Sequence, residues 1–223
     1  ITHYSDGQQE FQECAVKSRV LVARRPEFSL LETMLHDPES GYFLYERHLD
    51  RLATSARYFG IKCDLLAVRR RLNQEVQAPM NGPHRVRLLV RPSGAMNVQV
   101  AALPEAKVKG PIGARLAVTP VDETDPFLFH KTTHRDVYER QLAAHPKCSE
   151  VLLWNTGGEL TEFCTGNLVI ELEGEKWTPP VASGLLAGTF RADLLENQDI
   201  RERVLYKEDV ARAEQVYMIN SVR

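Results

Sequence analysis

The sequence predicts an α+β fold in two domains. Short β-prone runs bounded by turn residues occur together with amphipathic helical patterns, and 223 residues suffice for one large domain or two small ones. Residues 104–117 lack a clear period and contain Pro and Gly, which places the domain boundary there. We therefore expect a small α+β domain over 26–110 and a larger domain over 111–223, preceded by a short helical tail over 1–25.

The first half of the chain carries a signal for each expected element. Asp6 and Gln9 have the spacing of a capping box at the start of an amphipathic pattern. The runs FSLLETML and YFLYE are β-prone and flank the turn DPESG. The pattern ERHLDRLATSARYFG has apolar residues at helical spacing and ends on Gly60, and Ser93-Gly94 suits a hairpin turn. The expected elements are a helix over 6–22, strands over 28–35 and 42–46, helices over 46–60 and 63–76, and a hairpin over 84–103.

The second half mixes short strands with helices and contains no internal repeat or low-complexity tract. The apolar run Phe127-Leu128-Phe129 is expected to be a strand that ends at Lys131. The other expected elements are strands over 151–155, 160–164, 168–174, 203–208 and 216–220, and helices near 135–145 and 189–196.

Composition limits the classes of function. A formal net charge of −2 gives no reason to expect a nucleic acid or an anionic membrane as partner. The longest apolar runs are only a few residues, which excludes a transmembrane helix, and the polar start ITHYSDGQQEFQE does not resemble a signal peptide. The four cysteines contain no CxxC pair, which suits reduced thiols in a cytoplasmic protein. Because the chain does not begin with Met, we expect a fragment or a processed product.

Lys131 is the first residue that suggests chemistry. It follows three apolar residues, where desolvation lowers the pKa of an amine and a neutral amine can form a Schiff base. Taken alone, the stretch favours a surface lysine whose stem covers Phe129. His130 and His134 have the spacing of two metal ligands on a helix, but no further ligand is within motif reach, so no metal site is predicted.

Three other stretches suggest groups that would hold a charged ligand. Glu162 lies in a β-prone run, where burial would demand a cationic or hydrogen-bonding partner. Gly188-Thr189 precedes a helical pattern whose N-terminus suits a phosphate. Arg51 lies beside an apolar stripe and has the geometry to hold phosphate oxygens. Each also has an ordinary interpretation: a solvent-facing strand glutamate, a plain helix start, and an arginine on a solvated face.

Together these stretches resemble the fold-type IV pyridoxal-phosphate enzymes, which include branched-chain and D-amino acid aminotransferases and 4-amino-4-deoxychorismate lyases. The resemblance rests on ERHLDRL, HKTTHRDVY, LTEFCTGN and GLLAGTFR, in this order, and covers the chain from about Phe28 to Arg223. It implies that Lys131 binds pyridoxal 5'-phosphate covalently and then moves protons. It also implies that Glu162 keeps the ring nitrogen protonated and that Arg51 binds the phosphate. The remaining implied cofactor-binding residues are Thr165, Gly166, Asn167, Gly188, Thr189 and Phe190, and the implied substrate-binding residues are Thr33, His130 and Arg135.

Within this family, the chain resembles the lyase-like domain fused behind aminodeoxychorismate synthase component I. The segment ITHYSDGQQEFQECAVKSRVL resembles the C-terminal tail of such a component. The resemblance implies conversion of 4-amino-4-deoxychorismate to p-aminobenzoate and pyruvate by a homodimer that is linked to the synthase components. The alternatives are an aminotransferase of the branched-chain or D-amino acid type, and a non-catalytic domain that supports the synthase.

Overall fold

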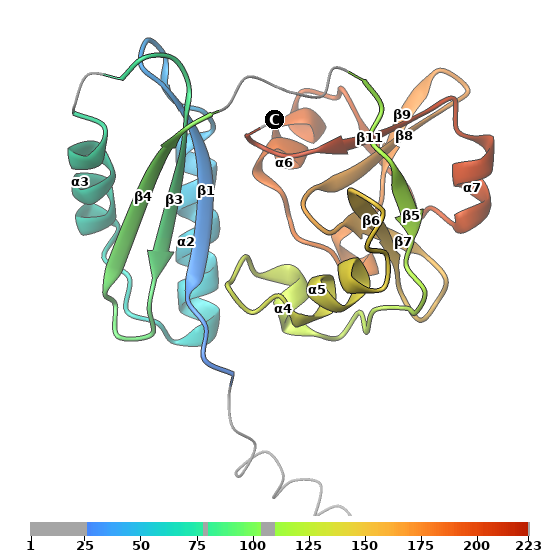
Figure 1. Cartoon of the computed structure of the whole chain (residues 1–223), viewed down its shortest axis with the longest axis horizontal. Helices are drawn as coiled ribbons and strands as arrows, with labels where there is room; N and C mark the ends of the chain where they lie inside the picture. Colours follow the sequence, from blue (N-terminus) through green and yellow to red (C-terminus); the bar gives the residue numbers. More distant parts are fainter. Residues whose placement is uncertain (1–25, 78–79, 104–109, 223) are drawn as a thin grey trace, which may run out of the picture.

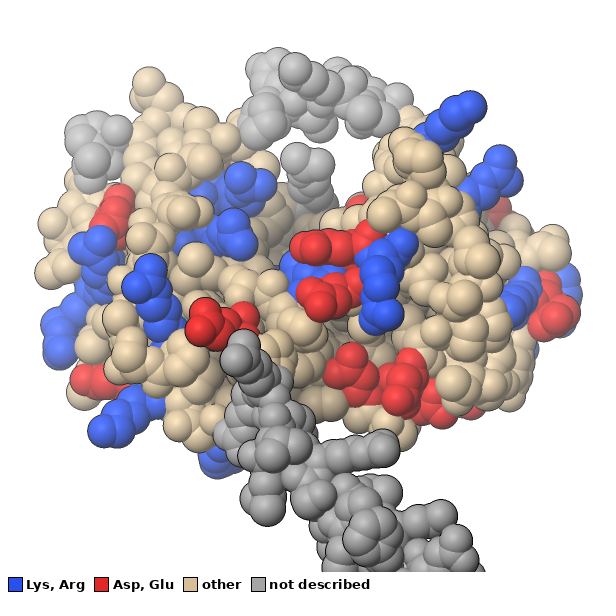
Figure 2. Space-filling view, turned by 60° about the horizontal axis from the view of Figure 1, so that its bottom comes forward, with Lys and Arg blue, Asp and Glu red and all other residues tan. Residues whose placement is uncertain are grey.

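The computed structural model describes residues 26–77, 80–103 and 110–222, which form two β-sheets with helices packed against them (Figure 1). The α+β prediction is therefore confirmed. The helix expected over 6–22, and with it the tail over 1–25, lies outside the described residues. None of the described helices is both long and apolar enough to cross a bilayer. Figure 2 shows basic and acidic side chains interspersed over one face, in keeping with the net charge of −2.

The first sheet has four antiparallel strands in the order β2-β1-β3-β4. Helices α2 and α3 cover one of its faces (Figure 1), because Leu30, Met34 and Leu88 on alternate strand positions pack against Leu49 and Leu72 of the helices. The helices expected over 46–60 and 63–76 and the hairpin over 84–103 are confirmed. The elements are β1 (Leu30–Asp37), β2 (Gly41–Tyr42), α2 (Tyr45–Phe59), α3 (Leu65–Glu75), β3 (His84–Val90) and β4 (Met96–Ala102).

The strand expected over 42–46 is wrong. Strand β2 ends at Tyr42, and Leu44 adopts a left-handed conformation with φ of 54°, which turns the chain into α2 at Tyr45. The β-prone aromatic residues of this run instead pack on one another, since the rings of Tyr42 and Tyr45 are stacked with centroids 5.0 Å apart.

The second sheet has seven strands in the order β10-β9-β8-β7-β6-β5, and β11 pairs with β8. The strands expected over 151–155, 160–164, 168–174 and 216–220 and the helices near 135–145 and 189–196 are confirmed. The elements are β5 (Ala114–Leu116), α4 (Pro126–Phe129), α5 (Asp136–Ala143), β6 (Glu150–Trp154), β7 (Leu160–Phe163), β8 (Asn167–Leu172), β9 (Glu175–Thr178), a 3-10 turn (Val181–Ser183), α6 (Thr189–Glu196), β10 (Arg201–Glu202), α7 (Lys207–Arg212) and β11 (Gln215–Ile219).

The strand expected before Lys131 and the strand expected over 203–208 are both wrong. In each case a helix begins within a run of β-prone residues. The side chain of Asp125 accepts a hydrogen bond from the Phe127 amide, and Pro126 occupies the first turn, so the run before Lys131 forms α4. Tyr206 and Asp209 form a capping box that begins α7 within the strand expected over 203–208.

Lys131 is held in place by the first sheet although it belongs to the second half of the chain. Its carbonyl accepts a hydrogen bond from the Leu31 amide at 3.0 Å, Thr132 forms a bridge with Leu30, and the Thr133 amide donates to Ser29. The chain after α4 therefore lies along the start of β1. This backbone pairing joins the two halves of the molecule beside the candidate site.

Candidate active site

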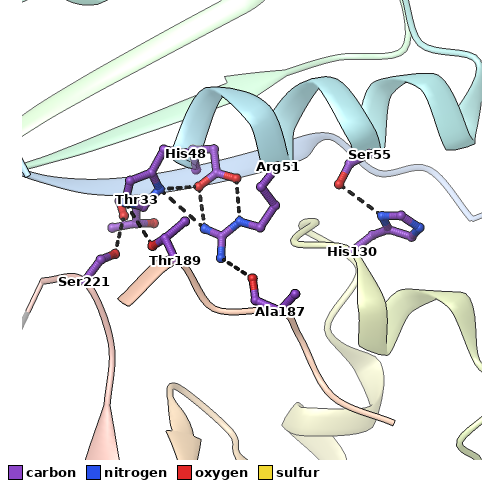
Figure 3. Close-up of polar contacts among 9 residues, drawn as sticks. Thr33, His48, Arg51, Ser55, His130, Ala187, Thr189 and Ser221 are labelled. Atoms are coloured by element: carbon purple, nitrogen blue, oxygen red, sulfur yellow. Dashed lines mark hydrogen bonds and ion pairs between the residues drawn. The ribbon is translucent and has the colours of Figure 1, made fainter. Parts of the chain in front are cut away.

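The candidate site lies between α2 of the first half and the segment that leads into α6 of the second. Figure 3 shows His48 and Arg51 of α2 directed toward Ala187 and Thr189. Ser221, which follows β11, lies on the same side, where its hydroxyl donates to the Thr33 carbonyl of β1 at 3.4 Å. Residues from distant parts of the sequence therefore come together around Arg51 and the start of α6.

Glu32 of β1 forms the anchor for Arg51. Its carboxylate accepts hydrogen bonds from Arg51 Nε at 2.9 Å and Nη2 at 2.6 Å, and it lies 2.7 Å from His48 Nδ1. Burial by itself would raise the pKa of Glu32, but the charge of Arg51 and the hydrogen bonds from His48 and Arg51 outweigh it and lower this pKa to about 2. Glu32 is therefore ionised at every pH at which the protein would work, and it fixes the orientation of the guanidinium.

The other side of Arg51 faces the start of α6. Arg51 Nη1 donates to the Ala187 carbonyl at 3.3 Å, and the Thr189 hydroxyl lies 3.3 Å from His48 Nε2. The N-cap residue of α6 is Gly188, which has no side chain to cap the helix, and the first turn contains no acidic residue. An arginine, a hydroxyl and backbone N–H groups at a helix N-terminus form a donor set that suits a phosphate.

Lys131 lies near this donor set. Burial lowers the pKa of its amine to about 8, and Arg51 acts in the same direction, whereas Glu32 and Glu162 oppose it. A pKa near 8 leaves about a tenth of the amine neutral at pH 7, compared with well under a thousandth for an ordinary lysine. Lys131 therefore has the protonation behaviour that a nucleophile or a proton carrier requires.

Glu162 of β7 is the second buried carboxylate. Burial raises its pKa to about 7, although hydrogen bonds from Tyr138 and Leu186 and the charge of Lys131 act against the shift. The Tyr138 hydroxyl donates to Oε1 at 2.8 Å, the Leu186 amide donates to Oε1 at 3.3 Å, and Asn167 Nδ2 donates to Oε2 at 3.2 Å. Every one of these partners is a neutral donor.

Gly166 and Gly188 permit close packing of the backbone around Glu162 and Asn167. Glu162 and Asn167 are register partners across the β7–β8 turn, which explains the spacing of the two residues in LTEFCTGN. A Cβ atom on Gly188 would fall 1.9 Å from Asn167 Oδ1, and one on Gly166 would fall 2.7 Å from the Ile219 carbonyl oxygen. Asn167 Nδ2 also donates to the Leu186 carbonyl at 2.9 Å, so the same side chain links Glu162 to the segment before α6.

The other residues implied by the resemblance are placed less centrally. The Thr165 hydroxyl donates to the Glu150 carboxylate, and the Phe190 ring packs edge-on against Phe43 with centroids 5.8 Å apart. His130 Nδ1 lies 3.0 Å from the Ser55 hydroxyl (Figure 3). The His130 ring also packs against the Tyr58 ring, with centroids 4.3 Å apart.

Arg135 lines the same small cavity as Lys131. Its Nη2 atom donates to the Cys164 carbonyl at 2.6 Å, and its guanidinium lies 4.5 Å from the centre of the Tyr138 ring. This cavity has a volume of about 20 Å³, with room for about one water molecule. Its lining consists of Phe127, His130, Lys131, Thr132, His134, Arg135, Tyr138 and Leu186.

Four residues of the site were missed in the sequence: Glu32, His48, Tyr138 and Ser221. Glu32 had a signal, because it shares the inward face of β1 with Leu30 and Met34, and a carboxylate at such a position requires a partner. His48, Tyr138 and Ser221 had no such signal in the sequence, because the residues that they contact are distant along the chain. Within the described residues, no three His, Cys, Asp or Glu side chains are arranged to hold a metal ion.

Comparisons with known proteins show the family to which the chain belongs. Residues 29–223 match the family described as "Amino-transferase class IV". A Schizosaccharomyces pombe protein named "Putative aminodeoxychorismate lyase" is 33% identical over 206 residues, which cover 88% of this chain and 87% of that protein.

Solved structures have the same fold. A Mesorhizobium loti structure described as a "Putative amino-acid aminotransferase" superposes with a TM-score of 0.82 at 29% identity, over 88% of this chain and 96% of that one. A hypothetical aminotransferase from Mycobacterium tuberculosis in a PLP-bound form gives a TM-score of 0.75 at 24% identity, over 87% of this chain and 78% of that one.

Proposed function

Since the chain belongs to the amino-transferase class IV family, a family of pyridoxal-phosphate-dependent enzymes, we propose that it binds pyridoxal 5'-phosphate and cleaves 4-amino-4-deoxychorismate into p-aminobenzoate and pyruvate. The observation that carries the proposal is the placement of Lys131 near two different ligand-binding ends. One end, at Arg51 and Thr189, has donors for a phosphate, and the other, at Glu162, has a carboxylate for a ring nitrogen.

The residues present fit this cofactor. The tight contacts at Gly166 and Gly188 bring backbone close to the Glu162 and α6 ends, where a Cβ atom would clash. Lys131 has a lowered pKa, because burial and the charge of Arg51 outweigh the opposing charges of Glu32 and Glu162. Thr165 and Gly166 lie on the turn between Glu162 and Asn167, and the PLP-bound form of the Mycobacterium tuberculosis protein shares the fold.

The chemistry divides between the cofactor and the protein. When bound, pyridoxal phosphate supplies a carbonyl carbon that joins an amine and a ring that accepts an electron pair. In our proposal, Lys131 Nζ takes the proton from the substrate carbon that bears the amino group. Glu162 holds a proton at the ring nitrogen, and Arg51 with Thr189 fixes the phosphate. Loss of the enolpyruvyl side chain as pyruvate makes the substrate ring aromatic, which renders the step strongly downhill.

An aminotransferase is the second candidate function. It is favoured by the Mesorhizobium loti structure, which matches this chain at 29% identity. The Schizosaccharomyces pombe relative favours the lyase instead. The two activities differ in their requirements, because the lyase releases pyruvate without any keto-acid acceptor.

The test is to load the protein with pyridoxal phosphate, desalt it, record the visible spectrum, and measure p-aminobenzoate and pyruvate formed without an acceptor. We expect a retained cofactor band and equal amounts of the two products. Lys131→Ala should lose the band and lower the rate by at least about a hundredfold, whereas the exposed Lys147→Ala should keep both. A retained band without products, but with amino transfer to a keto acid, would replace the lyase by the aminotransferase. No cofactor band and no products, in either the unaltered protein or Lys131→Ala, would support the non-catalytic alternative.

We extend the proposal to the assembly of the protein. The family resemblance favours a homodimer that acts beside aminodeoxychorismate synthase component I in the cytoplasm. Sedimentation of the purified chain tests the first part, with a mass of twice 25.3 kDa as the expected result.

A further inference from the structure

Tyr138 makes a contact that the proposed reaction leaves unexplained. Its hydroxyl, buried on helix α5, donates to Glu162 Oε1 at 2.8 Å. Burial raises the pKa of Tyr138 well above its ordinary value, and the neighbouring Glu162 charge adds to this shift. The phenol therefore keeps its proton, so in this contact with an ionised carboxylate Tyr138 acts as the donor.

The hydrogen bonds of Glu162 leave one acceptor position open. An ionised carboxylate has about four lone-pair sites, two on each oxygen. Oε1 accepts from Tyr138 and from the Leu186 amide, and Oε2 accepts from Asn167. Among the described residues, Oε2 accepts only the Asn167 hydrogen bond, which leaves one of its lone-pair sites for a further N–H donor such as a protonated ring nitrogen.

The donors around Glu162 hold its negative charge without cancelling it. A cation in direct contact would form an ion pair and would compete with a positively charged ring nitrogen. A phenol, an amide and a backbone N–H favour the ionised carboxylate by hydrogen bonding only. Arg135 lies over the Tyr138 ring and donates to the Cys164 carbonyl, and it acts on Glu162 through its charge.

We propose that Tyr138 is a positioning residue that keeps Glu162 ionised and oriented, with one acceptor site directed to the cofactor's ring nitrogen. The inference rests on the proposed cofactor. It adds a role for Tyr138, the last residue of the stretch HKTTHRDVY, to which the resemblance assigns none. Tyr138 acts through Glu162 and does not itself touch the reacting atoms.

A purely structural role is the competing explanation, because Tyr138 also packs in the apolar cluster with Leu128 and Val151. The two explanations differ in what removal of the hydroxyl changes. Loss of packing would destabilise the protein equally at all pH values. Loss of a donor to the ionised form would instead raise the pKa of Glu162.

The first experiment measures that pKa directly in the cofactor-free protein. Carboxyl-¹³C NMR of glutamate-labelled protein, with the Glu162 signal assigned by E162Q, gives the titration curve. Tyr138→Phe should raise the midpoint by about one to two pH units, the value of one hydrogen bond to a charged group. Tyr42→Phe is the matched control, because the Tyr42 hydroxyl donates to the Leu72 carbonyl at 2.9 Å in the first half of the chain. A midpoint that stays within 0.3 units (about the error of such titrations) in Tyr138→Phe would overturn the proposal.

A second measurement remains decisive if Tyr138→Phe folds poorly at neutral pH. The double-mutant cycle of Tyr138→Phe and Glu162→Gln, followed by urea unfolding, isolates the coupling between the two residues. The coupling should be present at pH 8.5, where Glu162 is ionised, and largely lost at pH 5. Equal coupling at both pH values would show a structural role. Because neither measurement uses the cofactor, failure of this inference is distinct from failure of the protein to retain pyridoxal phosphate.

Discussion

The two buried carboxylates of the site respond to burial in opposite ways. Glu32 is 2% exposed and Glu162 is 4% exposed, yet the pKa of Glu32 is lowered to about 2 and that of Glu162 is raised to about 7. Glu32 is hydrogen-bonded to a guanidinium and an imidazole, whereas the hydrogen-bond donors to Glu162 among the described residues are a phenol and two amide groups. The partners differ, and the depth of burial does not.

The comparison teaches how one pocket can bind two kinds of charge. At the Glu32 end the negative charge is already compensated, and Arg51 still presents Nη1 toward the start of α6, where a phosphate would bind. At the Glu162 end the hydrogen-bond donors are neutral and leave the negative charge unpaired. A cation that binds there therefore stabilises the ionised carboxylate. A cofactor with a phosphate at one side and a basic nitrogen at the other fits this polarity.

Removal of the cation at the Glu32 end should have the largest effect. Arg51→Gln leaves Glu32 buried with only His48, which should lower the free energy of unfolding by about 3–5 kcal/mol. Tyr138→Phe at the other end removes one neutral donor and should cost only about 1–2 kcal/mol. Urea unfolding at pH 7.5 compares them, and equal losses would contradict the distinction between the two ends.

The pH dependence of stability should show the same contrast in the cofactor-free protein. Glu162 has a folded-state pKa of about 7, above its ordinary 4.5, so the folded state binds more protons in this window and stability falls as pH rises through it. Glu32 has a folded-state pKa of about 2, so its contribution is lost as pH falls from 4.5 toward 2. Each contribution is about 3 kcal/mol at most.

Urea midpoints between pH 3 and pH 8 check this prediction. Glu162→Gln should abolish the loss of stability between pH 4.5 and 7 and leave the loss at low pH unchanged. A loss between pH 4.5 and 7 that persists in Glu162→Gln would mean that another group causes it.

An added methyl group at Gly188, which packs against Asn167, should lower both stability and cofactor affinity. Gly188→Ala places a Cβ atom 1.9 Å from Asn167 Oδ1, so the β7–β8 turn or the start of α6 must move, at a cost of about 1–3 kcal/mol. Gly113→Ala is the control, because its Cβ atom meets nothing within 4 Å. Thermal unfolding and pyridoxal phosphate titration should both show weakening in Gly188→Ala alone.

The smallest effect is expected at Ser221. Its hydroxyl donates to the Thr33 carbonyl at 3.4 Å, a long hydrogen bond near the Arg51 end. Ser221→Ala should change stability by less than about 1 kcal/mol and weaken pyridoxal phosphate binding only a few-fold. A fluorescence titration measures the affinity, and a loss of a hundredfold or more would assign Ser221 a principal role in phosphate binding.

Local signals explain which parts of the fold were predictable. Helices α2 and α3 and the β3–β4 hairpin carry complete local patterns, including Gly60 as the residue that ends α2. Strands β5 and β9 were missed because each is only three or four residues long and depends on its neighbours in the sheet. The runs before Lys131 and around Tyr206 were interpreted as strands because their residues are apolar or β-prone. The helices that form there are short and depend on capping contacts within a single turn.

The sequence by itself determined the α+β class, the order of the principal elements and the resemblance that singles out Lys131, Glu162 and Arg51. These depend on spacing along the chain, which local propensity and apolar periodicity record. Only the tertiary structure decided that Glu32 and His48 hold Arg51, that Tyr138 holds Glu162, and that Gly188 packs on Asn167. The physical reason is that a buried charge is defined by its partners, and these partners are brought into contact only when the two halves of the chain pack together.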